Sequence, residues 1–130
     1  MADDARLLER ARAVRLRAYA PFSGYRVGAA VVDENGDVYT GCNVENSSYP
    51  VGTCAESNAV GAMIAAGGTQ IKIIAIVGGH EEPEACTPCG ACRQTIAEFA
   101  ADDARILLLD ASGEPDMQTI DDLLPGSFKL

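Results

Sequence analysis

Two short segments carry the residues of this chain that are best suited to metal chemistry. Pro88 is followed by a Cys-x-x-Cys pair, Cys89 and Cys92, which can present two thiolates to one metal ion from a single turn. An earlier segment supplies a third thiolate, Cys54, and Glu56 follows two residues later. Three thiolates satisfy Zn²⁺ but leave its fourth tetrahedral position open, which is typical of a catalytic site. The pattern predicts one zinc ion per subunit, bound by these three cysteines.

An open position on zinc lowers the pKa of a bound water to about 7, so hydroxide becomes available at neutral pH. Glu56 flanks a ligand without being needed to fill the metal, and we expect it to carry protons. The plainer alternatives are ordinary thiols, a first-turn helix charge at Glu56, and a structural zinc site. A structural site needs a fourth ligand. Cys42, Cys86 and His80 are the candidates, and Cys86 is the strongest because it lies three residues before Cys89.

The composition excludes several classes of function. The chain has 130 residues and a formal net charge of −9, from 10 Lys and Arg against 19 Asp and Glu. It has no basic run, whereas proteins that hold DNA or RNA by its phosphates carry a basic face. We therefore expect a small neutral substrate and no nucleic acid. We also expect no membrane association, because no apolar stretch approaches the ~20 residues that span a bilayer.

Cysteine usage and the N-terminus indicate a cytoplasmic location. The first residues are acidic and lead into an amphipathic stretch, unlike a signal peptide. Five cysteines, an odd number with one Cys-x-x-Cys, favour metal binding or reactive thiols over disulfides. The length suits one domain, which we expect to span residues 1–130.

Apolar runs predict four strands, which cover residues 27–32, 38–42, 71–77 and 105–109. Helical spacing and capping signals predict four helices. The first covers residues 4–19 and is ended by Pro21, and the second covers 53–66 and is capped by Thr53. The third covers 89–100, and the fourth runs from Thr119 or Asp121 to Leu124. A hairpin followed by alternating helix and strand implies an α/β fold, a three-layer α/β/α sandwich with a mixed central sheet of about five strands.

Both metal-binding segments are predicted to lie at helix N-termini. The helix dipole places about half a positive charge there, and the free N–H groups can bond the sulfur atoms. Two such ends directed at one metal offset part of the thiolate charge. Cys54 and Glu56 diverge by about 200° in a regular helix, so both can reach the metal only where the helix begins.

Three further segments carry a resemblance to a known family: residues 20–30 (APFSGYRVGAA), 41–46 (GCNVEN) and 123–128 (LLPGSF). With the zinc motifs, they make the chain similar to the small, homotetrameric, three-cysteine cytidine deaminases over residues 19–128. The signature of zinc nucleobase deaminases is a Cys or His before a Glu, followed by Pro-Cys-x-x-Cys. The resemblance implies hydrolytic deamination of cytidine and deoxycytidine to uridine and deoxyuridine plus ammonia, in pyrimidine salvage. It also implies a cytidine deaminase-like catalytic domain and a homotetramer with shared active sites.

The resemblance also implies roles for individual residues. Zinc-bound hydroxide attacks C4 of cytosine, and Glu56 moves the proton from water to N3 and then to the amine. Phe22 packs on the pyrimidine ring, the backbone at Ala55 holds the base, and Phe128 enters from a neighbouring subunit. The residues that bond the ribose hydroxyl are Asn43 and Glu45. Without the resemblance, the two phenylalanines would be core aromatics and the two polar residues would be turn and surface residues.

One position departs from the family pattern. Members often have Arg directly after the Glu, where it offsets the thiolate charge, whereas this chain has Ser57. Helix ends, hydroxyl donors or Arg93 are the candidates to replace that charge. The runner-up function is a deaminase of a cytosine-containing antibiotic such as blasticidin, which Glu45 and Phe22 disfavour. A structural zinc module for protein interaction comes third, because it lacks a clear fourth ligand.

Overall fold

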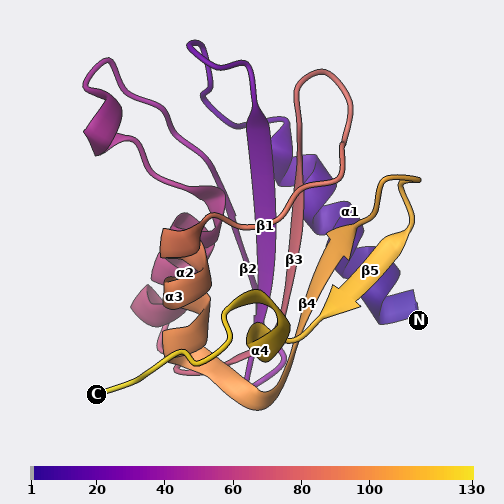
Figure 1. Cartoon of the computed structure of the whole chain (residues 1–130), viewed down its shortest axis with the longest axis vertical. Helices are drawn as coiled ribbons and strands as arrows, with labels where there is room; N and C mark the ends of the chain where they lie inside the picture. Colours follow the sequence, from indigo (N-terminus) through magenta and orange to yellow (C-terminus); the bar gives the residue numbers. More distant parts are fainter. Residues whose placement is uncertain (1) are drawn as a thin grey trace.

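A mixed sheet lies at the centre of the molecule (Figure 1). The structure is a computed structural model and describes residues 2–130. Its five strands run in the order β2-β1-β3-β4-β5, and β3 and β4 are parallel while every other neighbouring pair is antiparallel. The strands are β1 (Arg26–Asp33), β2 (Val38–Cys42), β3 (Ile71–Gly79), β4 (Ala100–Leu109) and β5 (Pro115–Gln118). The predicted mixed sheet of about five strands is confirmed.

Helices cover both faces of this sheet, as the three-layer prediction requires. Helix α1 (Ala2–Arg15) packs on one face. The other face is covered by three helices, α2 (Ala55–Ala65), α3 (Gly90–Phe99) and the short α4 (Ile120–Leu123). In Figure 1, α1 lies behind the strands on the right, α2 and α3 lie to the left of the strands, and α4 lies in front of them. A 3-10 turn, η1 (Tyr49–Val51), lies in the long connection between β2 and α2.

The central strand β3 shows why its sequence is continuously apolar. Ile74 and Ile76 belong to the core beneath α2 and α3, whereas Ala75 and Val77 belong to the core beneath α1. A strand buried on both faces gains from apolar residues at every position rather than at alternate ones. This arrangement explains the uninterrupted run that predicted the strand.

Helix α1 ends four residues earlier than predicted. Its last residue is Arg15, not residue 19, and the next residues form tight turns, with hydrogen bonds such as that from Ala18 N to Arg15 O. Beyond them, Tyr19 N donates to Asn43 O, and Glu45 N donates to Tyr19 O. The backbone leaves the helix to pair with the segment after β2, so a distant partner sets this boundary.

The sequence pattern missed β5 (Pro115–Gln118), which pairs with β4 from Ile106↔Gln118 to Leu109↔Pro115. Its sequence, PDMQ, contains no β-branched or aromatic residue, so local propensity gives no strand signal. As an edge strand it tolerates a proline at its start, because that position needs no further ladder donor. Pairing with the hydrophobic β4 explains why it forms.

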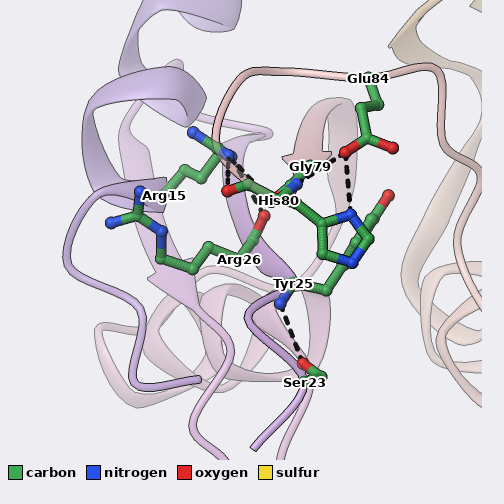
Figure 2. Close-up of polar contacts among 7 residues, drawn as sticks. All are labelled: Arg15, Ser23, Tyr25, Arg26, Gly79, His80 and Glu84. Carbon is green, nitrogen blue, oxygen red and sulfur yellow. Dashed lines mark hydrogen bonds and ion pairs between the residues drawn. The ribbon is translucent and has the colours of Figure 1, made fainter. Parts of the chain in front are cut away.

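A buried arginine fixes the end of β3, where the chain enters the loop that leads to Cys89. Arg15 is 2% exposed, and its guanidinium donates to three backbone carbonyls: Nε to Arg26 O at 3.1 Å and Nη2 to Gly79 O and His80 O at 2.8 Å (Figure 2). In the same loop, the carboxylate of Glu84 accepts from His80 N and lies 3.0 Å from His80 Nδ1. These hydrogen bonds therefore hold the backbone at the start of the loop in one position.

Close backbone contact between β2 and α2 depends on a glycine. A Cβ atom added to the buried Gly41 would lie 2.4 Å from Ala59 N and 2.7 Å from Ala55 O. Both atoms belong to the backbone of the first turns of α2, which cannot yield as a flexible side chain can. The absence of a side chain at Gly41 therefore sets the distance of α2 from the sheet.

We expect Gly41→Ala to cost about 3 kcal/mol of unfolding free energy, because overpacking against backbone forces α2 outward. The neighbouring Thr40 points to the opposite face of β2, and Thr40→Ala should cost much less. Urea denaturation followed by circular dichroism measures both variants. Equal stability of Gly41→Ala and the wild type would contradict the packing argument.

No helix in residues 2–130 is long and apolar enough to cross a membrane.

Candidate active site

Three cysteine sulfur atoms converge between α2 and α3. The Sγ atoms of Cys54, Cys89 and Cys92 all lie within 4.8 Å of one another, and those of Cys54 and Cys89 are 3.9 Å apart. With Zn–S bonds of about 2.3 Å, tetrahedral geometry separates two ligand sulfurs by about 3.8 Å. The cluster therefore fits a zinc ion, in both the softness of its donors and their spacing.

The cluster forms because two helices begin at the same place. Cys54 is the N-cap of α2 and Cys89 is the N-cap of α3, so each cysteine immediately precedes a helix. Cys89 Sγ accepts a hydrogen bond from Cys92 N at 3.5 Å. The prediction that both segments lie at helix N-termini is confirmed, but the predicted cap of α2 is wrong. Thr53 instead pairs with Val44 through the backbone, so Cys54 takes the cap position.

The pKa values of the three thiols differ because their surroundings differ. Hydrogen bonding from the backbone N–H of Cys92 holds the pKa of Cys89 below its ordinary value. Burial raises the pKa values of Cys54 and Cys92, and the nearby carboxylate of Glu56 adds to the effect at both. A coordinated metal ion deprotonates such thiols outright. The cluster is thus a site where metal binding would release protons.

Glu56 lies beside the cluster, in the first turn of α2. Its residue is 4% exposed, and burial raises the pKa of its carboxyl group. The carboxyl also forms hydrogen bonds with its own backbone N–H and with Cys92, which partly oppose that shift. A buried carboxyl with a raised pKa, placed next to a metal cluster, has the character of a general acid and base.

None of the three alternative ligands joins the cluster in the part of the chain that the structure describes. Cys42 is half-buried at the end of β2, and His80 is exposed at the start of its loop, in contact with Glu84. Cys86 lies in the wall of a pocket beside the cluster, but its sulfur is not one of the three that converge. The described residues therefore offer three protein ligands to a metal and no fourth.

A pocket of about 630 Å³ opens above the cluster. This volume falls in the range of small-molecule sites, roughly 300–1,000 Å³. Of the residues predicted to bind substrate, Phe22, Asn43, Glu45 and Ala55 line it, together with Glu56. The remaining lining residues include Tyr25, Val27, Tyr49, Cys54, Ile76, Cys86, Thr87 and Cys89.

Phe128, in contrast, does not line this pocket. It is exposed near the C-terminus, and its carbonyl lies 3.4 Å from Gln94 Nε2 of α3. The expectation that Phe128 enters a neighbour's site stays a prediction.

The two polar residues predicted to bond ribose already hold the pocket wall together. Asn43 Oδ1 accepts from Val27 N at 2.7 Å, and its Nδ2 donates to Tyr25 O at 2.9 Å. Glu45 accepts from the backbone N–H groups of Phe22 and Ser23 and from the Ser23 hydroxyl, and these bonds lower its pKa. An amide has four hydrogen-bonding sites and a carboxylate about four, so each keeps capacity for a ligand.

Tyr49 is a pocket residue that the sequence pattern did not single out. Its ring packs on Phe22 with centroids 5.7 Å apart and planes tilted by 55°. Both rings stand at the pocket mouth, and Tyr49 is 74% exposed. The only local signal was an aromatic residue before Pro50, which by itself indicates a turn.

Thiols suited to zinc, a buried carboxyl group and a nucleoside-sized pocket together define a hydrolytic metal site. The family model for the cytidine and deoxycytidylate deaminase zinc-binding region matches residues 1–108. The chain belongs to the cytidine and deoxycytidylate deaminase family and is a hydrolytic enzyme with a zinc-binding cysteine triad.

Individual relatives agree with this assignment. The chain is 40% identical to a cytidine deaminase of Sporosarcina psychrophila over 126 residues, which cover 97% of this chain and 91% of the relative. It is 42% identical to the cytidine deaminase of Mycobacterium tuberculosis over 113 residues, 87% of this chain and 80% of the relative. The crystal structure of a cytidine deaminase from Burkholderia pseudomallei superposes with a TM-score of 0.86 at 40% identity, covering 95% of this chain and 98% of that one.

Proposed function

We propose that this enzyme hydrolytically deaminates cytidine and deoxycytidine to uridine and deoxyuridine with release of ammonia, in pyrimidine salvage. The observation that carries the proposal is a pocket of about 630 Å³ whose wall contains the buried Glu56 and two members of the three-cysteine cluster, Cys54 and Cys89. Residues 1–130 would form one catalytic domain. A cytoplasmic location, which this role requires, stays a prediction.

The proposed chemistry divides between the metal and the protein. Zinc held by Cys54, Cys89 and Cys92 supplies Lewis acidity, which lowers the pKa of water at its open position to about 7. Glu56 would accept the proton of that water and give it to N3 of the cytosine ring as the remaining hydroxide forms a bond to C4. It would then take the proton of the new C4 hydroxyl group and pass it to the amine, so that the C4–N bond breaks and ammonia leaves. Its burial favours this role, because a carboxyl group whose pKa is raised gives up a proton and takes it back with little cost.

The pocket wall supports a nucleoside as the substrate. Phe22 offers an aromatic face for the pyrimidine, and free N–H groups at the first turn of α2, near Ala55, can donate to the base. We assign the ribose hydroxyl to the remaining hydrogen-bonding capacity of Asn43 and Glu45. Among the described lining residues there is no Lys or Arg, so a nucleotide phosphate would lack a partner.

We further propose that the enzyme is a homotetramer whose pockets are completed across subunits. Three exposed apolar side chains, Phe22, Val44 and Tyr49, line the pocket. Two more are exposed next to them: Tyr19 pairs with Val44, and Val51 shares η1 with Tyr49. Exposed apolar groups gathered in one region favour a protein contact. Phe128 projects from the C-terminal segment of the same chain and would fill the neighbouring mouth.

The ligand assignment predicts about one zinc per chain by metal analysis. Cys89→Ala should lose both the metal and deaminase activity, because two thiolates hold zinc too weakly. The double variant Cys42→Ser, Cys86→Ser is the matched control and should keep full zinc content. Loss of metal from that control would mean that the ligands have been assigned wrongly.

The proton-transfer role predicts that Glu56→Gln keeps zinc and the fold while kcat falls by more than the ~10²–10⁴ typical of one acid–base step, because Glu56 acts more than once. The loss of ultraviolet absorbance on incubation with cytidine measures kcat, and this assay on the wild type also tests the proposed function itself. Glu98→Gln, an exposed position on α3, is the control. A Glu56→Gln variant with a tenth of wild-type kcat would refute the role.

The shared site predicts that Phe128→Ala raises the KM for cytidine about tenfold, with little change in zinc content. The reason is that burying one aromatic face against the base contributes about 1–3 kcal/mol. Met117→Ala, which truncates an exposed apolar residue on β5, should leave KM unchanged. Sedimentation velocity in parallel reports assembly. A fully active monomer at nanomolar concentration is the result that would rule out shared sites.

A further inference from the structure

No Lys or Arg side chain of residues 2–130 forms a hydrogen bond with a sulfur atom of the metal cluster. Zn²⁺ with three thiolates carries a net charge near −1, and Glu56 adds a further negative group when ionised. In residues 2–130, the hydrogen-bond contacts of the three sulfur atoms are with one another, with Cys92 N and with Ser57 Oγ. The cluster must therefore be stabilised by neutral donors.

Arg93 is the nearest arginine in sequence to the ligands, but its guanidinium is used elsewhere. Its Nε donates to Pro88 O at 2.8 Å, and its Nη1 donates to Leu123 O at 2.7 Å. These bonds tie the loop before Cys89 to the end of α4. Arg93 thus braces the backbone around the site without directing its charge at the sulfurs.

A hydroxyl group lies where a thiolate needs a donor. Ser57 Oγ is 3.9 Å from Cys92 Sγ, and Ser57 Oγ makes no other hydrogen bond in the described chain. Cys92 is fully buried, so its sulfur depends on donors from the protein rather than from solvent. A metal-bound thiolate can only accept, and a serine hydroxyl carries one donor hydrogen, which fixes the direction of the bond.

We propose that Ser57 donates its hydroxyl hydrogen to the metal-bound thiolate of Cys92 and thereby sets the zinc affinity of this enzyme. The inference rests on the proposed zinc site. Ser57 is a positioning residue for the metal, because it lies in the first turn of α2, next to Glu56 in the chain, and does not line the pocket. Partners of metal ligands commonly alter metal affinity by 10–100-fold.

The test is competition for zinc between the purified enzyme and a chelator of known affinity. Ser57→Ala should bind zinc about 10-fold more weakly than the wild type. Ser57→Thr keeps a hydroxyl at the same position and should retain most of the affinity. Ser112→Ala, in the distant turn between β4 and β5, is the matched serine control and should match the wild type. Thermal melts of the zinc-loaded proteins verify that each variant is folded.

A spectroscopic readout accompanies the affinity. In the cobalt-substituted enzyme, the thiolate-to-metal charge-transfer absorption should shift to lower energy in Ser57→Ala, because a thiolate that loses a donor gives up its electrons more easily. Ser57→Thr should leave the absorption near its wild-type position.

Two outcomes would overturn the inference. If Ser57→Ala binds zinc within twofold of the wild type, the hydroxyl has no part in holding the metal. If Ser57→Ala and Ser57→Thr are equally weakened, the effect is one of packing rather than of hydrogen bonding. In either case, zinc lost from Cys89→Ala but retained by the wild type leaves the proposed function standing, whereas a wild type that binds no zinc would reject both.

Discussion

The site depends on two helices that begin at one point. Cys54 and Cys89 are N-caps of α2 and α3, and a cap position directs its side chain across the end of its own helix. When two such ends meet, two sulfurs converge together with the unpaired N–H groups of both helices. The metal cluster thus needs no dedicated scaffold. It needs only that α2 and α3 pack side by side at the correct distance from the sheet. Gly41 sets that distance for α2.

The pocket wall is built by the same polar groups that are proposed to read the substrate. Asn43 fixes the backbone at Val27 and Tyr25, and Glu45 fixes the backbone at Phe22 and Ser23. Asn43 thus uses two of its four hydrogen-bonding sites and Glu45 three of about four before any ligand arrives. Such preorganisation lowers the entropy lost on binding, because the aromatic wall and the polar groups are already placed.

The sequence predicted those features whose causes are local. The starts of α2 and α3 and the strands β1, β2 and β3 depend on neighbouring residues, and each lies within two positions of its predicted bounds, whereas β4 begins five residues before the predicted Arg105. Features set by distant partners were missed. The end of α1 depends on pairing with the segment after β2, and β5 depends on the ladder offered by β4.

The contacts of long side chains also depend on distant partners and were missed for the same reason. Arg15 lies seven residues after Leu8 and so on the same face of the helix. Nothing local predicts that its guanidinium would donate to three carbonyls, one from β1, one from β3 and one from the loop after β3. The sequence likewise did not predict which carbonyl groups accept hydrogen bonds from the guanidinium of Arg93. A side chain of this length has several carbonyls within reach, and the folded backbone selects among them. This choice matters for chemistry, because a cation held away from the thiolates leaves the metal to neutral donors, and neutral donors stabilise bound sulfur without adding charge to a pocket that must accept an uncharged pyrimidine.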